Sequence, residues 1–191
     1  MRVWLLMFVA AAVLAGCSSI QPVQRERVEL GSGLSVLGSR VWNRFPPGSA
    51  GADAAWTQDG LPLDHVLFIA GRPDGEPMFE RSRSRRSLQF RNTMTATEIA
   101  ELWGTELALA EHRAIEVGVP QLAAFAGRAG FRCGYSYATA DGLVFDGMAE
   151  GAVVAGRLYL IAFAGTRSHH FPAHAPAARH LIASALVAVD R

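Results

Sequence analysis

The chain has 191 residues, a formal net charge of +1 and 18 basic residues, all of them arginine. Because lysine is absent, a phosphate-loop lysine, a Schiff-base lysine and a Ser-Lys dyad are all excluded. The near-neutral charge also provides no overall field that would attract nucleic acid, so we expect no nucleic-acid partner.

The N-terminus has the layout of a bacterial export signal. Arg2 supplies a positive start, residues 4–14 are apolar, and Leu14-Ala15-Gly16-Cys17 places two small residues before a cysteine. The apolar run is shorter than the roughly 20 residues that a membrane-spanning helix needs. The segment resembles the lipobox signal of bacterial lipoproteins, which implies that residues 1–16 are a signal peptide and that Cys17 is the lipid-attachment site.

The lipobox resemblance also implies a location. Two or three acyl chains on Cys17 bind a membrane firmly, whereas a single chain does not. In that family an aspartate after the cysteine retains the protein at the inner membrane, and here that position is Ser18. We therefore expect membrane lipid as a partner through N-terminal acylation, and a lipid-anchored position in the cell envelope, at the outer membrane and facing the periplasm.

The rest of the chain is long enough for one domain with a hydrophobic core. We assign residues 17–25 to the lipidated N-terminus and a tether, and residues 26–191 to a single globular domain. Cys133 is the cysteine that remains after lipidation, so no internal disulfide is expected. It alternates with aromatic residues, which predicts a buried position on a strand.

In the first half of the domain, strands are predicted at residues 28–30, 34–45 and 63–70, with a loop rich in proline and glycine at residues 46–55. A run of arginines follows these strands. If it is extended, alternate guanidinium groups lie along one side, a geometry suited to phosphate groups. A solvated loop is the alternative interpretation. The candidate residues for an anionic ligand are Arg81, Arg83, Arg85 and Arg86.

A helix is predicted to begin after Thr95. Thr95 and Glu98 have the spacing of a capping box, in which the hydroxyl and the carboxylate each accept a hydrogen bond from a free backbone amide. Apolar residues such as Ile99 and Trp103 then recur at helical spacing. We expect this helix to end near Gly118.

Three strands are predicted in the second half, at residues 131–138, 143–154 and 157–164, joined by tight turns that favour antiparallel hairpins. The last of them is apolar on both faces, which predicts that helices cover both sides of the sheet. A final helix is predicted after Pro176. The predicted fold class is therefore α+β, a mostly antiparallel sheet flanked by helices on both faces in an α/β/α sandwich.

Histidines cluster between the last strand and the last helix. Imidazole groups bind zinc, copper or nickel, so His169, His170 and His174 are the candidate metal ligands. Pro172 lies between His170 and His174, so their spacing need not place them on one helical face. No closely spaced carboxylate or thiol completes the set. A polar loop at the sheet edge is the alternative interpretation.

The common catalytic motifs are absent from the sequence. It has no Gly-x-Ser-x-Gly elbow, no His-Glu-x-x-His run and no Ser-x-x-Lys. We therefore predict no catalytic residue and no cofactor. An unrecognised hydrolase would need a triad assembled from scattered residues.

Two short tryptophan elements carry a further resemblance. Trp42-Asn43-Arg44-Phe45 and Trp56-Thr57-Gln58-Asp59-Gly60, the second followed by Leu63-Asp64, resemble elements of uncharacterised proteobacterial lipoproteins. The layout of strands, helix, antiparallel strands and terminal helix is similar to the Mog1/PsbP-like fold. This resemblance implies a binding or assembly role more often than catalysis, and it carries over no catalytic residue.

These observations together predict a membrane-anchored envelope lipoprotein that acts as a non-enzymatic binding or assembly module. Its partner would be an envelope protein or anionic lipid headgroups. The alternatives are a periplasmic metal-binding protein that uses the loop from His169 to His174, and an unrecognised hydrolase.

Overall fold

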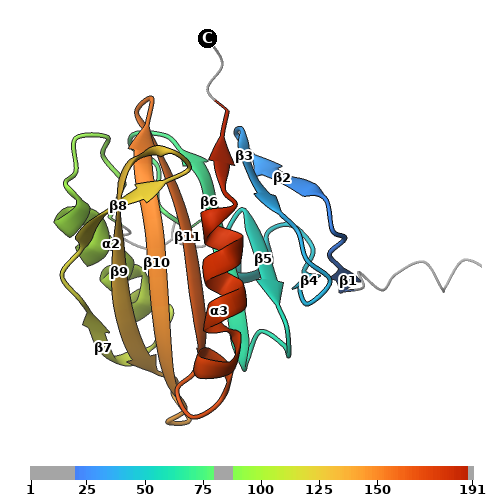
Figure 1. The fold of residues 1–191 in the computed structure, drawn as a ribbon. Helices are drawn as coiled ribbons and strands as arrows, with labels where there is room; N and C mark the ends of the chain where they lie inside the picture. The colour runs from blue at the N-terminus through green and yellow to red at the C-terminus, as the bar shows by residue number, and fades with distance from the viewer. Residues whose placement is uncertain (1–19, 80–87, 189–191) are drawn as a thin grey trace, which may run out of the picture.

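The computed structural model describes residues 20–79 and 88–188. These residues form a large sheet, a small sheet and two α-helices, α2 (Ala96–Leu109) and α3 (His170–Ala183), with one turn of 3₁₀-helix, η1 (Ser49–Gly51) (Figure 1). Within these ranges, no helix has both the length and the apolar character needed to cross a bilayer.

Both sheets are antiparallel at every strand pairing among the described residues. The small sheet has the order β12 (Leu186–Val187), β3 (Leu34–Leu37) and β2 (Arg27–Gly31). The large sheet has the order β1 (Gln21–Pro22), β4 (Asn43–Arg44), β5 (Ala54–Thr57), β6 (Asp64–Arg72), β11 (Arg157–Thr166), β10 (Val144–Val154), β9 (Arg128–Ala138) and β7 (Arg113–Val117), while β8 (Gln121–Phe125) also pairs with β9.

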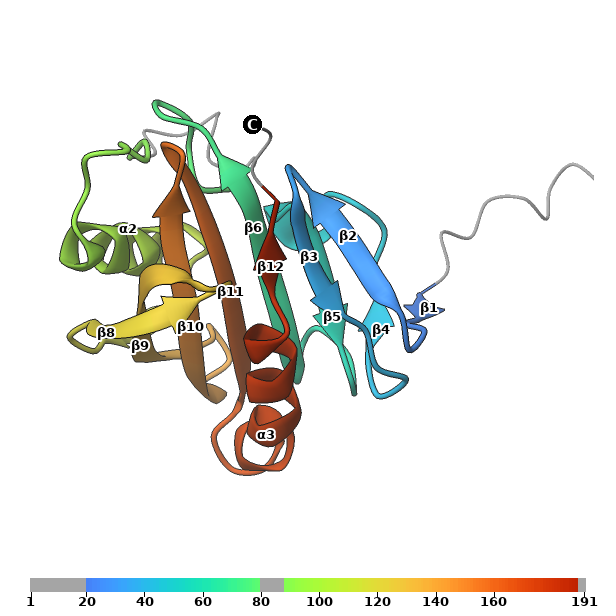
Figure 2. The same cartoon turned by 45° about the horizontal axis from the view of Figure 1, so that its top comes forward.

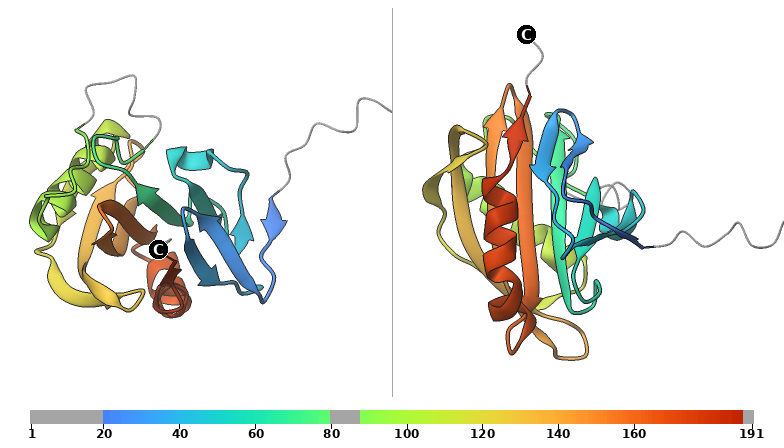
Figure 3. Two further views of the ribbon diagram at one scale, coloured as in Figure 1. Left: turned by 90° about the horizontal axis from the view of Figure 1, so that it is seen from above. Right: turned by 45° about the vertical axis from the view of Figure 1, so that its right-hand side comes forward.

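The central strand β11 supplies side chains to two cores, one on each face of the large sheet. Leu158 and Leu160 lie in the core that α2 covers, and Ile161 and Phe163 lie in the core that α3 covers. Period-two alternation of side chains explains why this strand is apolar at nearly every position. The two helices lie on opposite sides of the sheet when it is viewed from above (Figure 3).

Fewer helices cover the large sheet than the sequence predicts. One helix lies on each face, and on the face of α3 the small sheet lies beside that helix and shares the cover (Figure 2). The mostly antiparallel sheet is confirmed. The full α/β/α sandwich is not, because the described residues are rich in strands and hold only these two α-helices.

Helix α2 begins as predicted and ends earlier. The capping box is present, since Thr95 Oγ1 accepts a hydrogen bond from the Glu98 amide at 3.3 Å and Glu98 Oε2 accepts one from the Thr95 amide at 2.7 Å. The predicted end near Gly118 is wrong. Glu111 takes a left-handed backbone conformation with φ of 66°, and the chain then enters β7, where Arg113, Glu116 and Val117 pair with β9.

The predicted strand at residues 34–45 is two strands in different sheets. β3 ends at Leu37, because the chain turns at Gly38, where an added Cβ would lie 2.4 Å from the Gln24 carbonyl oxygen. The chain pairs again only at β4. The predicted loop at residues 46–55 also ends too late, since Ala54 and Ala55 already pair with β6.

Candidate functional site

Several predicted ligand-binding residues lie outside the described part of the chain. These are the lipid-attachment residue Cys17 and the arginine run of Arg81, Arg83, Arg85 and Arg86. The candidate metal ligands His169, His170 and His174 lie inside it, at the start of α3. The structure therefore shows which residues surround these three histidines.

The two inner histidines lie one helical turn apart. Helix α3 begins at His170, well before the predicted start after Pro176. Pro172 lies in the first turn, where the amide that proline lacks would have no partner within the helix. Pro172 therefore does not separate His170 from His174, and their ring centroids are 5.9 Å apart.

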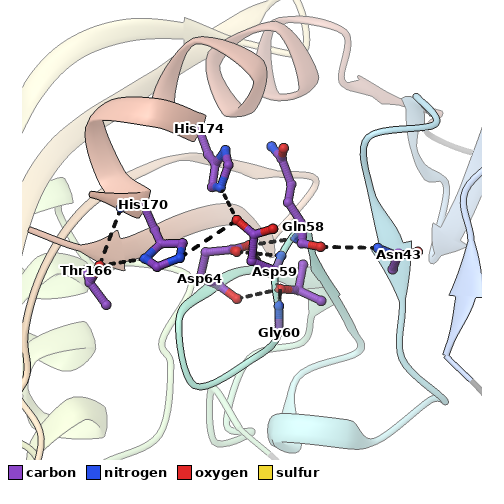
Figure 4. A network of polar contacts seen from close by, with 9 residues as sticks. Asn43, Gln58, Asp59, Gly60, Asp64, Thr166, His170 and His174 are labelled. Carbon is purple, nitrogen blue, oxygen red and sulfur yellow. Dashed lines mark hydrogen bonds and ion pairs between the residues drawn. The ribbon is translucent and has the colours of Figure 1, made fainter. Parts of the chain in front are cut away.

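Both of these histidines face Asp59, which lies on the loop between β5 and β6 (Figure 4). Asp59 Oδ2 is 2.6 Å from His174 Nε2 and 3.8 Å from His170 Nε2. Each histidine side chain is 16% exposed and that of Asp59 is 48% exposed. The contact is therefore reachable from solvent, while the imidazoles are largely covered.

A buried carboxylate holds the loop that carries Asp59. Asp64 is fully buried, and its Oδ1 accepts hydrogen bonds from Thr57 Oγ1 at 3.0 Å and from the Gln58 amide at 2.7 Å. Its Oδ2 accepts one from the Asp59 amide at 2.8 Å. Three donors compensate for removing this charge from water. Asp64 therefore fixes the backbone of Asp59.

The loop and the helix are brought together by the end of β11. Asp64 lies opposite Gly165 in the pairing of β6 with β11, and the amide of Thr166 donates to the Leu63 carbonyl at 3.0 Å. Because α3 starts a few residues after Thr166, its first turn lies over the loop. The strand register thus places the histidines beside Asp59.

Thr166 orients the ring of His170. Its hydroxyl oxygen lies 2.7 Å from His170 Nδ1, which leaves Nε2 directed at Asp59. The order of hydroxyl, imidazole and carboxylate resembles that of a hydrolase triad. Thr166 is only 3% exposed, however, so its oxygen is not accessible to a substrate. The contact positions an imidazole and does not support the hydrolase alternative.

His169 stands apart from this cluster. It is the exposed N-cap residue of α3 and makes no capping hydrogen bond through its side chain. Its ring is perpendicular to that of His170, with centroids 5.0 Å apart. The carboxylates that accompany the histidines come from distant sequence positions instead, and ligand atoms of Asp59, Asp64 and His174 all lie within 4.8 Å of one another.

Sequence reasoning missed the two aspartates as part of a site. Asp59 and Asp64 stood out only as members of the tryptophan element and as a turn signal. Asp59 and His174 are 115 positions apart, so no local spacing connects them. The signal that connects them is the register of β6 on β11, which a single sequence does not supply.

A second concave region lies beside α2. It is a cavity of about 360 Å³ with a mainly apolar lining that includes Phe79 and Trp103, together with His65 and His112. Burial lowers the pKa of His65 from 6.5 to about 4, so its imidazole is neutral at neutral pH. His112 stacks on Tyr137 with centroids 4.2 Å apart. These walls suit an apolar molecule better than an anion.

The lowered pKa of His65 predicts a loss of stability in acid. Between pH 6.5 and about 4 the unfolded chain takes up a proton on His65 that the folded protein does not, so the free energy of unfolding decreases over this range and levels off below it. Between pH 7 and pH 4, we expect the free energy of unfolding of the His65→Gln variant to decrease by about 3 kcal/mol less than that of the unchanged protein. Urea unfolding measures both, and equal losses would contradict a neutral buried imidazole.

Cys133 occupies the core position that the sequence predicts. It is 7% exposed on β9, and burial raises the pKa of its thiol to about 11. A thiol with so high a pKa is protonated at neutral pH and is a poor nucleophile. The interpretation of Cys133 as a small core residue is confirmed.

No protein-family model and no curated protein matches the chain. Solved structures do. The solution structure of cyanobacterial PsbP (CyanoP) from Synechocystis has a TM-score of 0.60 at 15% identity, and the match covers 92% of this chain and 99% of that chain. This chain has a PsbP-like fold. LpqN, which is involved in cell envelope biogenesis of Mycobacterium tuberculosis, has a TM-score of 0.51 at 11% identity, covering 87% of this chain and 92% of its own.

The PsbP-like fold confirms the predicted layout of strands and helices. At these identities the likeness is one of fold, and no residue of either protein is carried over to this chain. The cluster of Asp59, His170 and His174 therefore stands on its own geometry.

Proposed function

We propose that the protein is a lipid-anchored, non-enzymatic binding module of the cell envelope. The observation that carries this proposal is the likeness of fold over nearly the whole chain to LpqN, an envelope-biogenesis protein, and to CyanoP. The motif Leu14-Ala15-Gly16-Cys17 supplies the signal for acylation. Both features are compatible with a body that binds a partner while acyl chains keep it at a bilayer.

The start of the described chain supports a short connection between bilayer and body. Gln21 and Pro22 already pair with β4, and the amide of Val23, which is 2% exposed, donates to the Trp42 carbonyl at 2.8 Å. The stretch that was expected to be a free tether is therefore shorter than residues 17–25. Because an extended chain spans at most about 3.6 Å per residue, acyl chains on Cys17 would keep the β1 edge within roughly 15 Å of the bilayer.

The partner in this proposal is an envelope protein or anionic lipid headgroups. For a protein partner, β8 offers an open edge, because among the described strands it pairs only with β9. Leu122 on β8 is 93% exposed, and Val119, in the segment just before β8, is 85% exposed. Exposed apolar groups on an open edge favour association. For headgroups, the run from Arg81 to Arg86 offers positive charge.

The lipid anchor gives a direct test. We expect the Cys17→Ser variant to move from the membrane fraction to the soluble fraction, because it lacks the sulfur that carries diacylglycerol. Cys133→Ala is the matched control, since Cys133 is buried in the core, and it should stay in the membrane fraction. Cell fractionation with immunodetection, together with mass spectrometry of the N-terminal peptide, measures both variants.

The same fractions separate anchoring from headgroup binding. If Cys17→Ser retains some membrane association that is released at 1 M salt, the remainder is electrostatic and supports binding by the arginines. If it stays in the membrane as fully as the Cys133→Ala control, even at 1 M salt, the lipid anchor is disproved.

A further inference from the structure

We propose that Asp59, His170 and His174 form a binding site for a divalent transition-metal ion of the Zn²⁺ class. The site lies between the loop that joins β5 to β6 and the first turns of α3 (Figure 4). The proposal goes beyond the envelope role and does not depend on it, because the ligands belong to the folded body and not to the anchor.

The distances between ligand atoms fit a metal complex after small shifts. Zinc binds imidazole nitrogen and carboxylate oxygen at about 2.0–2.2 Å, so two ligand atoms of a tetrahedral site lie about 3.4 Å apart. Asp59 Oδ2 lies 2.6 Å from His174 Nε2 and 3.8 Å from His170 Nε2, distances on either side of this value. Both histidines present Nε2 to the same carboxylate oxygen. Their ring centroids are 5.9 Å apart, so an ion at that point contacts all three side chains once the His170 ring moves toward His174.

The ring of His170 is held in the orientation that a ligand needs. Metal-binding histidines commonly use their second ring nitrogen in a hydrogen bond that fixes the ring. In His170 the second nitrogen is Nδ1, and its hydrogen-bond partner is the buried Thr166 Oγ1 at 2.7 Å. The hydrogen bond does not occupy Nε2, which remains directed at Asp59.

The charge of the site favours a divalent cation. Two carboxylates, Asp59 and Asp64, lie with His174 in a group whose ligand atoms are all within 4.8 Å. One divalent ion balances the negative charge of two carboxylates. Asp64 is fully buried and fixes the backbone of Asp59, because its carboxylate accepts a hydrogen bond from the Asp59 amide.

Three protein ligands leave one position of a tetrahedral ion open. Zinc sites of this kind complete their shell with water or with a ligand group. Asp59 is 48% exposed, so the open position faces solvent. Ion binding replaces the direct contact of His174 Nε2 with Asp59 Oδ2, because both atoms then bind the ion.

The first test uses the full chain in non-ionic detergent and ZnCl₂ as the probe. Titration calorimetry is expected to show one ion bound per chain. His170→Ala, His174→Ala and Asp59→Asn should each weaken binding at least 100-fold, and Thr166→Val should weaken it about 10-fold because it removes the orienting hydrogen bond. His169→Ala is the matched control, since His169 is exposed and outside the cluster, and it should bind like the unchanged protein.

Two outcomes overturn the proposal. One is no saturable binding of Zn²⁺ up to millimolar concentration, in which case the contact of His174 with Asp59 only holds α3 to the loop. The other is unchanged affinity in His174→Gln, a variant that can still hydrogen-bond Asp59. Thermal unfolding without metal checks that this variant is folded. Co²⁺ absorption gives a second readout, because the visible bands of a nitrogen- and oxygen-bound ion should disappear in His174→Gln and persist in His169→Ala.

Discussion

Replacing Asp64 with alanine is expected to lower the free energy of unfolding by about 4 kcal/mol, which is a large part of the stability of a domain of this size. The carboxylate accepts hydrogen bonds from Thr57 Oγ1 and from the amides of Gln58 and Asp59. Alanine leaves the amides of Gln58 and Asp59 without an acceptor beside a fully buried position, so the cost of their burial is no longer compensated, whereas Thr57 Oγ1 keeps the backbone carbonyl oxygen of residue 64 at 2.8 Å. Urea unfolding at pH 7 measures the loss.

Two further variants separate hydrogen bonding from charge. Asp146→Ala is the control, because Asp146 forms an ion pair with Arg167 at 2.7 Å in which both side chains are partly exposed, and such pairs contribute about 0–1 kcal/mol. Asp64→Asn should lie between the two at about 2 kcal/mol, because the amide can still accept at one atom but presents N–H to the Asp59 amide. If Asp64→Ala is as stable as Asp146→Ala, Asp64 does not hold the loop.

The Asp64 variants also bear on the metal site. Asp64 holds the backbone of Asp59, so its removal is expected to weaken Zn²⁺ binding even though the three ligands remain. A loss of stability with unchanged affinity would show that Asp59 is positioned by the histidines and not by its own loop. Measuring both stability and Zn²⁺ affinity thus shows whether the loop or the histidines position Asp59.

Local sequence signals predicted much of the framework. The capping box of Thr95 and Glu98 has a short-range cause, because both hydrogen bonds form within one helical turn. The turn at Ala155 and Gly156 also follows from local preference, since both residues have positive φ and join β10 to β11 as a hairpin. The apolar run of β11 correctly indicated a strand that is buried on both faces.

The functional cluster had no such local signal. His174 and Asp59 meet only because β6 and β11 pair with Asp64 opposite Gly165. The start of α3 was misplaced because Pro176 was interpreted as the first residue of the helix, whereas it lies inside α3, which begins at His170. Likewise, residues from Arg113 onward were interpreted as the end of a helix, although their exposed and partly buried side chains alternate with the period of two that is typical of a strand, here β7.

A substitution at Gly165 is also expected to reduce stability strongly, because α3 packs closely on β11 there. A Cβ added there would lie 2.7 Å from the Phe171 amide nitrogen and 2.9 Å from the His170 carbonyl carbon. Both atoms belong to the backbone, so no rotation of a side chain relieves the overlap. We expect Gly165→Ala to lower the free energy of unfolding by about 3 kcal/mol, because the start of α3 must move away from the strand.

This displacement should also be visible at the metal site, because His170 is one of the residues that must move. We expect Gly165→Ala to weaken Zn²⁺ binding at least 10-fold, since ligand atoms must stay within a few tenths of an ångström of their places. The matched control is Gly134→Ala on β9, whose added Cβ would meet its nearest atom, the Gly147 carbonyl oxygen, at 3.8 Å. That variant should stay within about 0.5 kcal/mol of the unchanged protein and keep its affinity. If both alanine variants behave alike, α3 does not pack on β11 as closely as the backbone distances require, and the position of His170 has another cause.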